Sequence, residues 1–520
     1  MPRLVAAAAA LLFAAAPSFA QGEPPENQVA KDRTRWDQAK DQQGAPDGRV
    51  YPDVDEDSLK RANDDVLALR KKVWEGELAP GQFYSSIQDA YARRFGPDYA
   101  AKVKVFLDAM AKAAPKSGQT VDFARMTDAQ RAEFFRLMPK GAELHLHLTG
   151  AIPGDKLLEI GEQLGVKLPV DGILKVMRLA DLAAYGVPAD KKELAVADLP
   201  AKLRSDLAAS LVTKDGETFP QFLDKWKVIG PITNNEKAQY LMMKYLAEYA
   251  KAQNIVYLEL LVSGNPPEAQ EWAVAAAKKV EKETGVTLRL LAYDGWYSSM
   301  EQDEAAIAKA RQLYPEVVGF NMVADERMPP LDHYEAFKPL REKLARLQVT
   351  LHAGEQAGTA SNIVNDLLLN PKRYGHATHV EEDPLAEAVL YENKIPVEVS
   401  LISNEKTLVQ TDLSKHPEPK LLAWGVPIVP DTDDPGVFGS TLSDEYRLSQ
   451  SQFGLSWDQL KEMSRNGVRS SFVDDATKAR LLKDLDRRID KFEKSSDFRR
   501  FKIAPSALQA PEPVELHLEK

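Results

Sequence analysis

The chain has 520 residues, a formal net charge of −11 and no cysteine. Without cysteine there are no disulfides, no thiol nucleophile and no thiolate metal ligands. The acidic balance argues against nucleic acid as a partner, because phosphate would be repelled. A hydrophobic content of 44% is typical of a globular protein.

Residues 1–20 predict a secretory signal peptide. Arg3 is followed by an apolar run from Leu4 to Ala16, which is too short to span a bilayer, and small residues lead up to Ala20. We expect cleavage after Ala20 and a secreted or periplasmic protein. A buried N-terminal helix is the alternative interpretation. No later stretch is apolar enough to predict a membrane span, so we expect no membrane partner.

Residues 21–136 predict a polar arm followed by a helical extension. The arm, which runs to about Tyr51, is polar and contains several prolines and glycines. From Val54 onward, apolar residues recur at helical spacing, for example in 58–74 and 99–110. This extension could form a homodimer, or it could equally pack on the rest of its own chain.

Residues 137–505 predict an α/β domain in which eight short apolar runs alternate with helical patterns. Strands that alternate with helices form parallel sheets, and eight units favour a closed (β/α)8 barrel of the TIM type. About a hundred residues separate the first two strands, which predicts lid helices over the barrel mouth. Helical periodicity continues from Asp444 to about Phe501, and residues 506–520 predict an irregular tail. The predicted strands are Glu143–Leu148, Ile255–Val262, Thr287–Tyr293, Val317–Val323, Val349–Leu351, Tyr374–Thr378, Pro396–Leu401 and Val426–Val429.

Five of the 8 histidines lie at or next to the C-terminal ends of predicted strands, which form the catalytic face of such a barrel. His145 and His147 are two residues apart in one strand, so both imidazoles point to the same side. They can therefore hold one ion inside the barrel, and a pair of hydrogen-bonded histidines is the alternative. His352 ends the fifth strand and can supply a third nitrogen.

Glu355 and His376 follow the fifth and sixth strands and suit proton transfer. A carboxylate at the barrel mouth, shielded from bulk solvent, can carry a proton, whereas Glu355 alone could simply mark a helix N-terminus. His376 is placed to orient or deprotonate a water molecule, and His379 just beyond it is expected to support the site.

Three carboxylates, Asp431, Asp433 and Asp434, follow the eighth strand. Such acids repel unless cations or protonation offset them, which favours one on a metal and one on a water molecule or substrate. A polar loop is the alternative for Asp431. Three histidines and one carboxylate without sulfur suit zinc. The fourth strand, Val317–Val323, carries no lysine to bridge two metals, so we expect one zinc ion per subunit.

As a set, these segments resemble the adenosine deaminase family of the amidohydrolase superfamily. The similarity runs from about Lys140 to Phe501, with the motifs in family order. The matching motifs are KGAELHLHLTGAI from Lys140, LHAGE from Leu351, RYGHATH from Arg373, SLISNEKT from Ser400 and DTDDP from Asp431. The helical extension looks like that of the secreted, growth-factor-related branch of the family.

The resemblance implies zinc-dependent deamination of adenosine and 2′-deoxyadenosine to inosine and 2′-deoxyinosine, with release of ammonia and a purine nucleoside as the small-molecule partner. Glu355 would donate a proton to purine N1, while His376 and Asp434 would hold the zinc-bound water. The implied zinc ligands are His145, His147, His352 and Asp433. The residues implied to contact the substrate are His147, Thr149, Ala324 and Asp434.

Two positions depart from the family pattern. The neutral Thr149 stands where the family carries an aspartate that meets the ribose 5′ hydroxyl, and Ala324 stands where a glycine backbone contacts purine N3. The change at Thr149 keeps a second function open, the deamination of adenine or of a 5′-modified adenosine. A third alternative, suggested by the extension, is a non-catalytic secreted binding or signalling protein, which the complete set of metal and proton-transfer residues opposes.

Overall fold

The computed structural model describes residues 54–114, 117–264, 268–342 and 345–503. The predicted signal peptide, the polar arm and the irregular tail lie outside these residues. Among the helices of the described residues, none is both long enough and apolar enough to cross a membrane.

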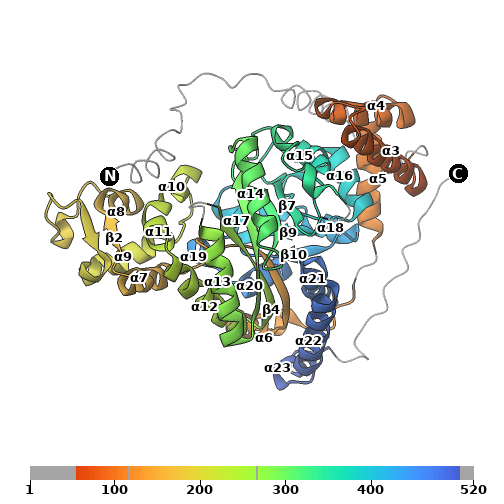
Figure 1. Ribbon diagram of the computed structural model, residues 1–520. Helices are drawn as coiled ribbons and strands as arrows, with labels where there is room; N and C mark the ends of the chain where they lie inside the picture. The colour runs from red at the N-terminus through yellow and green to blue at the C-terminus, as the bar shows by residue number, and fades with distance from the viewer. Residues whose placement is uncertain (1–53, 115–116, 265–267, 343–344, 504–520) are drawn as a thin grey trace. The chain divides into compact units, whose positions relative to one another are not determined.

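Eight parallel strands form the predicted barrel, and their order around it follows their order along the chain (Figure 1). The strand interiors are almost entirely buried, as expected where helices cover one side and the barrel core fills the other. All eight predicted strands are confirmed, with ends shifted by up to three residues. The observed strands are β1 (Lys140–His147), β4 (Ile255–Ser263), β5 (Thr287–Gly295), β6 (Val317–Val323), β7 (Gln348–Ala353), β8 (Arg373–His376), β9 (Val397–Val399) and β10 (Ile428–Pro430).

The seam between the last strand and the first lies just beyond β10. Asp433 forms an isolated parallel bridge with Leu146 of β1. The backbone N–H of His147 donates to the carbonyl of Asp433 at 2.8 Å, and the N–H of Asp433 donates to the carbonyl of His145 at 3.1 Å. The turn after β10 is therefore held in register with the end of β1.

Helices between the strands cover the outside of the barrel (Figure 1). Some of them begin at a side-chain cap: the Asn235 side chain, for example, accepts hydrogen bonds from the backbone of Lys237 and Ala238 at the start of its helix. The main wall helices are α12 (Glu236–Ala252), α13 (Ala269–Thr284), α14 (Met300–Gln312), α15 (Ala360–Asn365), α16 (Pro384–Asn393) and α18 (Glu418–Ala423).

The seventh predicted strand is the one that the structure shortens most. Leu401, the predicted end of the seventh strand, instead begins α17 (Leu401–Lys406), and β9 stops at Val399. The cause is a buried carboxylate outside the strand, because Glu445 accepts the backbone N–H of Leu401 at 2.9 Å.

The insertion between β1 and β4 contains five helices and a small antiparallel sheet of β2 (Lys167–Pro169) and β3 (Glu193–Ala195), whereas the sequence predicted helices alone. The ring of Phe222 in the insertion stacks on the ring of Phe438, with 5.5 Å between their centroids. Phe438 belongs to the short helix α19 (Pro435–Phe438), which follows the β10 turn. The insertion thus contacts the mouth of the barrel, as a lid does. The helices are α7 (Gly154–Gln163), α8 (Val170–Met177), α9 (Ala201–Ser210), α10 (Phe219–Asp224) and α11 (Trp226–Thr233).

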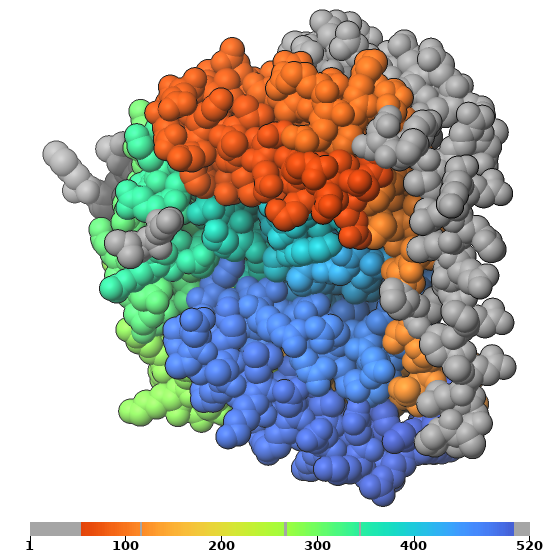
Figure 2. All heavy atoms as spheres, turned by 90° about the vertical axis from the view of Figure 1, so that its right-hand side faces the viewer, coloured from red at the N-terminus to blue at the C-terminus, as the bar shows by residue number. Residues whose placement is uncertain are grey.

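The N-terminal extension packs on the barrel of its own chain. Its helices are α3 (Glu56–Trp74), α4 (Phe83–Phe95) and α5 (Tyr99–Ala113). Helices α3 and α5 lie beside α16, α5 also lies beside α18, and α4 lies beside α15 (Figures 1 and 2). The side-chain amides of Asn63 and Asn393 bond reciprocally, at 3.2 and 2.9 Å. The indole of Trp424 donates to the carbonyl of Leu107 at 2.9 Å. These specific polar contacts show that the extension and the barrel pack together as one domain.

The predicted helical C-terminal region is also confirmed. Helix α6 (Asp128–Leu137) leads into β1 and packs through Phe134 on aromatic rings of the C-terminal helices, with Trp457 at a centroid distance of 5.7 Å. These helices are α20 (Leu442–Phe453), α21 (Trp457–Ser470), α22 (Asp475–Glu493) and α23 (Ser496–Arg499).

Candidate active site

Four side chains meet at the barrel seam, where the carboxyl ends of β1 and β7 face the turn after β10. One potential ligand atom from each lies within 4.8 Å of all the others. The Asp433 Oδ1 atom is 3.2 Å from Nε2 of His147 and 3.5 Å from Nε2 of His145. His352 completes the set, with its ring centroid 4.5 Å from that of His145. The structure therefore brings together all four residues that the sequence indicated as metal ligands.

Asp433 has an unusual backbone conformation. Its φ of 63° lies in the left-handed region, which residues other than glycine rarely adopt. The Ser403 hydroxyl donates to its Oδ2 at 2.7 Å, which leaves Oδ1 facing the histidines. Burial alone would raise the pKa of Asp433, but the imidazoles of His145 and His147 beside it hold this pKa well below its usual range. The carboxylate is thus ionised and aimed at the imidazoles.

His352 is neutral in this setting. Burial and the neighbouring histidines hold its pKa well below the usual value. Its Nδ1 is 3.2 Å from Oδ1 of Asn321 on β6, an acceptor, so Nε2 is the nitrogen left for a metal. Asn321 occupies the strand in which the sequence lacked a bridging lysine, and the structure gives that position a role as a support of His352.

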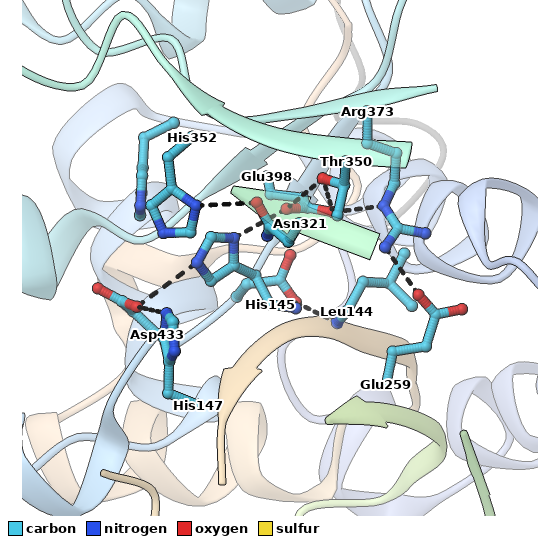
Figure 3. A network of polar contacts seen from close by, with 12 residues as sticks. Leu144, His145, His147, Glu259, Asn321, Thr350, His352, Arg373, Glu398 and Asp433 are labelled. Carbon is cyan, nitrogen blue, oxygen red and sulfur yellow. Dashed lines mark hydrogen bonds and ion pairs between the residues drawn. The ribbon is translucent and has the colours of Figure 1, made fainter. Parts of the chain in front are cut away.

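A layer of buried charges lies behind His145 (Figure 3). Glu398 Oε2 is 2.8 Å from His145 Nδ1, and Glu398 Oε1 accepts a short hydrogen bond from Arg373 Nε. Burial opposes ionisation, yet the Arg373 charge and the His145 hydrogen bond lower the pKa of Glu398 to about 2. Arg373 in turn bonds Glu259 on β4 at 2.7 Å. The ionised Glu398 therefore fixes the proton of His145 on Nδ1 and presents Nε2 to the cluster.

These four residues fit a divalent metal ion. The Nε2 atom of His145 is buried without a hydrogen-bond partner among the described residues. A buried imidazole nitrogen in that state is costly unless it binds something, and three imidazoles with one carboxylate are a typical donor set for zinc and similar ions.

Glu355 and His376 lie together beside the cluster. Glu355 Oε1 is 3.7 Å from His376 Nε2. Burial, reinforced by the charge of Asp433, raises the pKa of Glu355 to about 8. Burial and the nearby His145 lower the pKa of His376 to about 4. At neutral pH the pair is thus a protonated carboxyl group next to a neutral imidazole, which can donate and accept a proton respectively.

The turn that carries Glu355 is tied down by a second buried acid that the sequence did not single out. Glu326 Oε1 accepts the backbone N–H of Gln356 and the hydroxyl of Thr359, both at 2.6 Å. Glu326 follows β6, so it links the turns after two neighbouring strands and positions Glu355 indirectly.

The two remaining aspartates of the β10 turn have separate surroundings. Asp434 is buried beside Gly150, where an added Cβ would lie 1.6 Å from Asp434 Oδ1, and that oxygen has no hydrogen-bond partner among the described residues. Burial and the charge of Asp433 raise the pKa of Asp434 well above its usual range. Asp431 instead accepts backbone N–H groups of Leu144 at 2.5 Å and His145 at 3.1 Å. Asp431 is therefore a buried residue that stabilises the backbone of β1, not part of a solvated polar loop.

The two positions that depart from the family pattern follow the carboxyl ends of β1 and β6. Thr149 Oγ1 accepts a hydrogen bond from the indole Nε1 of Trp226 in the insertion, at 3.2 Å. Ala324, just after β6, has φ of 75° and so keeps the left-handed backbone that glycine favours. His379 is turned away, between Glu382 and the carbonyl of Val409, which agrees with a supporting role.

Sequence reasoning missed Glu398, Asn321, Ser403 and Trp226. A signal for Glu398 was present, since it is a carboxylate between two valines in a buried strand, and such a residue needs a charged partner. Trp226 gave no signal, because its contact with Thr149 spans two elements of an insertion whose packing the sequence pattern does not predict.

Comparisons with known proteins agree with this geometry. The family model described as adenosine deaminase matches residues 189–488, more than half of the chain. An adenine deaminase of Agrobacterium fabrum is 32% identical over 275 residues, covering 51% of this chain and 84% of that protein. An adenosine deaminase of Streptococcus mutans is 27% identical over 355 residues, covering 66% of this chain and 91% of that protein.

A solved structure shares the fold. An amidohydrolase from Burkholderia ambifaria with bound Zn aligns with a TM-score of 0.53 and 22% identity, over 74% of this chain and all of that one. The fold and the cluster at its carboxyl-terminal face are those of an α/β-barrel hydrolase. The chain belongs to the adenosine deaminase family of the amidohydrolase superfamily, and its enzyme class is that of the hydrolytic deaminases.

Proposed function

We propose that this protein deaminates adenosine and 2′-deoxyadenosine with water, giving inosine or 2′-deoxyinosine and ammonia, at a site that holds one zinc ion per subunit. The observation that carries the proposal is the placement of the Glu355–His376 pair directly beside the four-residue cluster. The names of the two relatives, an adenine and an adenosine deaminase, support a 6-aminopurine as the substrate.

The proposed zinc ligands are His145, His147, His352 and Asp433. A zinc ion there would act as a Lewis acid that makes water nucleophilic near neutral pH. The protein's own contribution is orientation: the carboxylate of Glu398 and the amide of Asn321 hold the two imidazoles with Nε2 toward the cluster.

Proton transfer is assigned to Glu355 and His376. With a pKa raised to about 8, Glu355 carries a proton at pH 7 and can donate it to purine N1, which makes C6 more electrophilic. With a pKa lowered to about 4, His376 is neutral and can accept a proton from the attacking water. Asp434, with its buried Oδ1, is proposed to hydrogen-bond the same water and hold it against C6. His376 then returns its proton to the amino group and the Glu355 carboxylate takes the proton of the new C6 hydroxyl, so that collapse of the tetrahedral adduct breaks the C6–N bond, forms the C6 carbonyl and releases ammonia.

Substrate contacts are proposed for His147, Thr149 and Ala324, in addition to Asp434. Because Ala324 keeps the left-handed backbone, its N–H can still meet purine N3. Thr149 is neutral, which also favours a second candidate function, the deamination of adenine or a 5′-modified adenosine.

The test is a substrate panel with metal analysis on one purified sample. Adenosine, 2′-deoxyadenosine, adenine and 5′-methylthioadenosine are compared by absorbance change and ammonia release. We expect stoichiometric zinc and the highest kcat/KM with adenosine or 2′-deoxyadenosine. A clear preference for adenine would replace the first candidate with the second, and zinc-loaded protein inert on all four would refute both.

A further inference from the structure

The turn that carries Glu355 is bonded at both ends to the loop after β8. The carbonyl of Gly354, just before Glu355, accepts the backbone N–H of His379 at 2.8 Å. The backbone N–H of Gly358, just beyond Glu355 on the other side, donates to Glu382 Oε2 at 2.6 Å. The carboxyl group assigned to donate the proton therefore lies between two bonds that come from the same neighbouring loop.

His379 and Glu382 are also bonded to each other and to a third loop. His379 Nδ1 lies 3.1 Å from Glu382 Oε1, and His379 Nε2 lies 3.1 Å from the carbonyl oxygen of Val409, in the segment after α17. Carboxylates and carbonyls only accept hydrogen bonds, so both ring nitrogens carry a proton. Burial opposes this charge, but the hydrogen bond to Glu382 raises the pKa of His379. The imidazolium thus joins the loop after β8 to the segment that follows β9.

The loop after β6 holds the same turn from the other flank. Glu326 Oε1 accepts the backbone N–H of Gln356 and the hydroxyl of Thr359, both at 2.6 Å. Strand β7 lies between β6 and β8 in the barrel, so the turn that follows it is bonded by a glutamate on each side. The turn cannot tilt toward either neighbour without losing a hydrogen bond.

The backbone of this turn decides where the Glu355 carboxyl group lies. Its contact with His376, at 3.7 Å, is longer than a hydrogen bond and does not fix the carboxyl group by itself. A proton donor must come within hydrogen-bond reach of the atom that it protonates. A displacement of about 1 Å can cost about a hundredfold in rate. Residues that fix the turn therefore bear directly on proton transfer.

We propose that Glu382 and His379 are positioning residues for the proton donor, because they hold the turn that carries Glu355 against the loops after β8 and β9. This inference rests on the proposed deaminase function and deepens its proton-transfer step. It gives His379 a defined part in the site, since its backbone and its ring both contribute bonds.

The first test removes the Glu382 carboxylate. In zinc-loaded enzyme, Glu382→Ala should lower kcat for adenosine by about 10–100-fold and change KM by only a few-fold, because proton donation is completed in the transition state. Bound zinc should remain, because Asn321 on β6 still holds the nearby ligand His352. Glu381→Ala, the adjacent glutamate with 43% of its side chain exposed, is the matched control and should keep the wild-type kcat.

Glu382→Gln provides the conservative rescue. Its amide oxygen can still accept the N–H of Gly358, and its NH₂ group can donate to Nδ1 of a neutral His379. Both bonds are thereby kept without the charge. We expect this variant to recover most of the kcat that Glu382→Ala loses, and a loss equal to that of alanine would contradict the bonding role.

The decisive test repeats Glu382→Ala in the Glu355→Gln background. A residue that acts only by placing the Glu355 proton has nothing left to place there, so the further loss in kcat should be less than about twofold. An equal loss in both backgrounds would make Glu382 a general structural residue and overturn the inference. An undiminished kcat for Glu382→Ala in the wild-type background would overturn it as well.

A second variant keeps the test independent of the folding of the first. His379→Phe retains a ring of similar size and removes both side-chain bonds, and it should lower kcat by about tenfold in wild type and by less than about twofold beside Glu355→Gln. If the wild-type enzyme deaminates adenosine but neither variant shows this dependence on Glu355, the proposed function stands and the inference fails. Zinc-loaded wild-type protein that deaminates no purine would instead refute the proposed function.

Discussion

Glu398 shows how much of the proposed metal site depends on a residue that would not touch the metal. Its carboxylate is shared between His145 Nδ1 and Arg373, with the Thr350 hydroxyl at 3.3 Å. Its negative charge keeps the proton of His145 on Nδ1, the ring nitrogen that faces away from the cluster. Carboxylates that bond metal-binding histidines in this way fix the orientation of the ring and make its other nitrogen a stronger ligand.

Replacing Glu398 with glutamine should therefore weaken metal binding by about 10–100-fold, because the amide keeps the shape and loses the charge. Competition with a chromogenic chelator measures this affinity directly, without reference to turnover. Glu301→Gln, an exposed residue of α14, is the control. Equal chelator competition in the two variants would show that Glu398 has no influence on the metal.

Glu355 gives the site its expected pH dependence. Its pKa is raised to about 8, so the proton-donating form is present at lower pH and is lost as the pH rises through 8. The pKa of His376 is lowered to about 4, so its basic form persists down to that pH. We expect kcat/KM to be level near neutrality and to fall tenfold per pH unit on the alkaline side.

The pH–rate profile is measured on zinc-loaded enzyme together with Glu355→Gln. That variant should retain its metal and lose about 10²–10⁴-fold in kcat, since general acid catalysis is removed. Undiminished turnover by Glu355→Gln would reassign the proton donor.

At the scale of elements, the turns after β1 and β10 pack so closely that one of them requires glycine. An alanine Cβ at position 150 would lie 1.6 Å from Asp434 Oδ1. The contact connects the shape of one turn to the place of a carboxyl group on the other. Neither strand alone positions Asp434.

Gly150→Ala should therefore move Asp434 and lower kcat by about a hundredfold, the cost of displacing a catalytic group by about 1 Å. The metal should remain, because the Ser403 hydroxyl and the bridge to Leu146 hold the neighbouring Asp433 in place. Gly81→Ala, which has open space around the new methyl group, provides the comparison. Turnover and metal content are measured on both, and normal kcat for Gly150→Ala would separate Asp434 from the reaction.

Sequence reasoning succeeded at the scale of elements where patterns are local. Strand alternation placed all eight strands, and their ends placed the histidines, because the carboxyl ends of barrel strands meet at one face. It failed where a partner comes from a distant element. Nothing near Leu401 indicates that Glu445 ends the strand early, and nothing near Thr149 indicates Trp226.

At the scale of the whole molecule, the N-terminal extension is joined to the barrel by partly buried polar pairs. The amides of Asn63 and Asn393 each donate to the other. Removing one leaves the other short of a partner in a buried place, which costs more than removing both. The extension should therefore unfold together with the barrel.

Asn63→Ala should lower the free energy of unfolding by about 1–3 kcal/mol, and the double variant with Asn393→Ala should lose less than the sum of the two single changes. Thermal or chemical denaturation of the four proteins in this cycle measures the coupling. Strictly additive losses, or an early transition confined to the extension, would mean that it folds independently.

The bridge between Leu146 and Asp433 has a consequence for biosynthesis. The three histidines of the cluster are all translated before Asp433, and the bridge that orients this carboxylate needs β1 already in place. A nascent chain that has not yet passed the β10 turn thus holds imidazoles but lacks both the fourth donor and the closing contact. High-affinity metal binding would then be one of the last events of maturation. A chain truncated before residue 433 would lack the fourth ligand and could not complete the metal site.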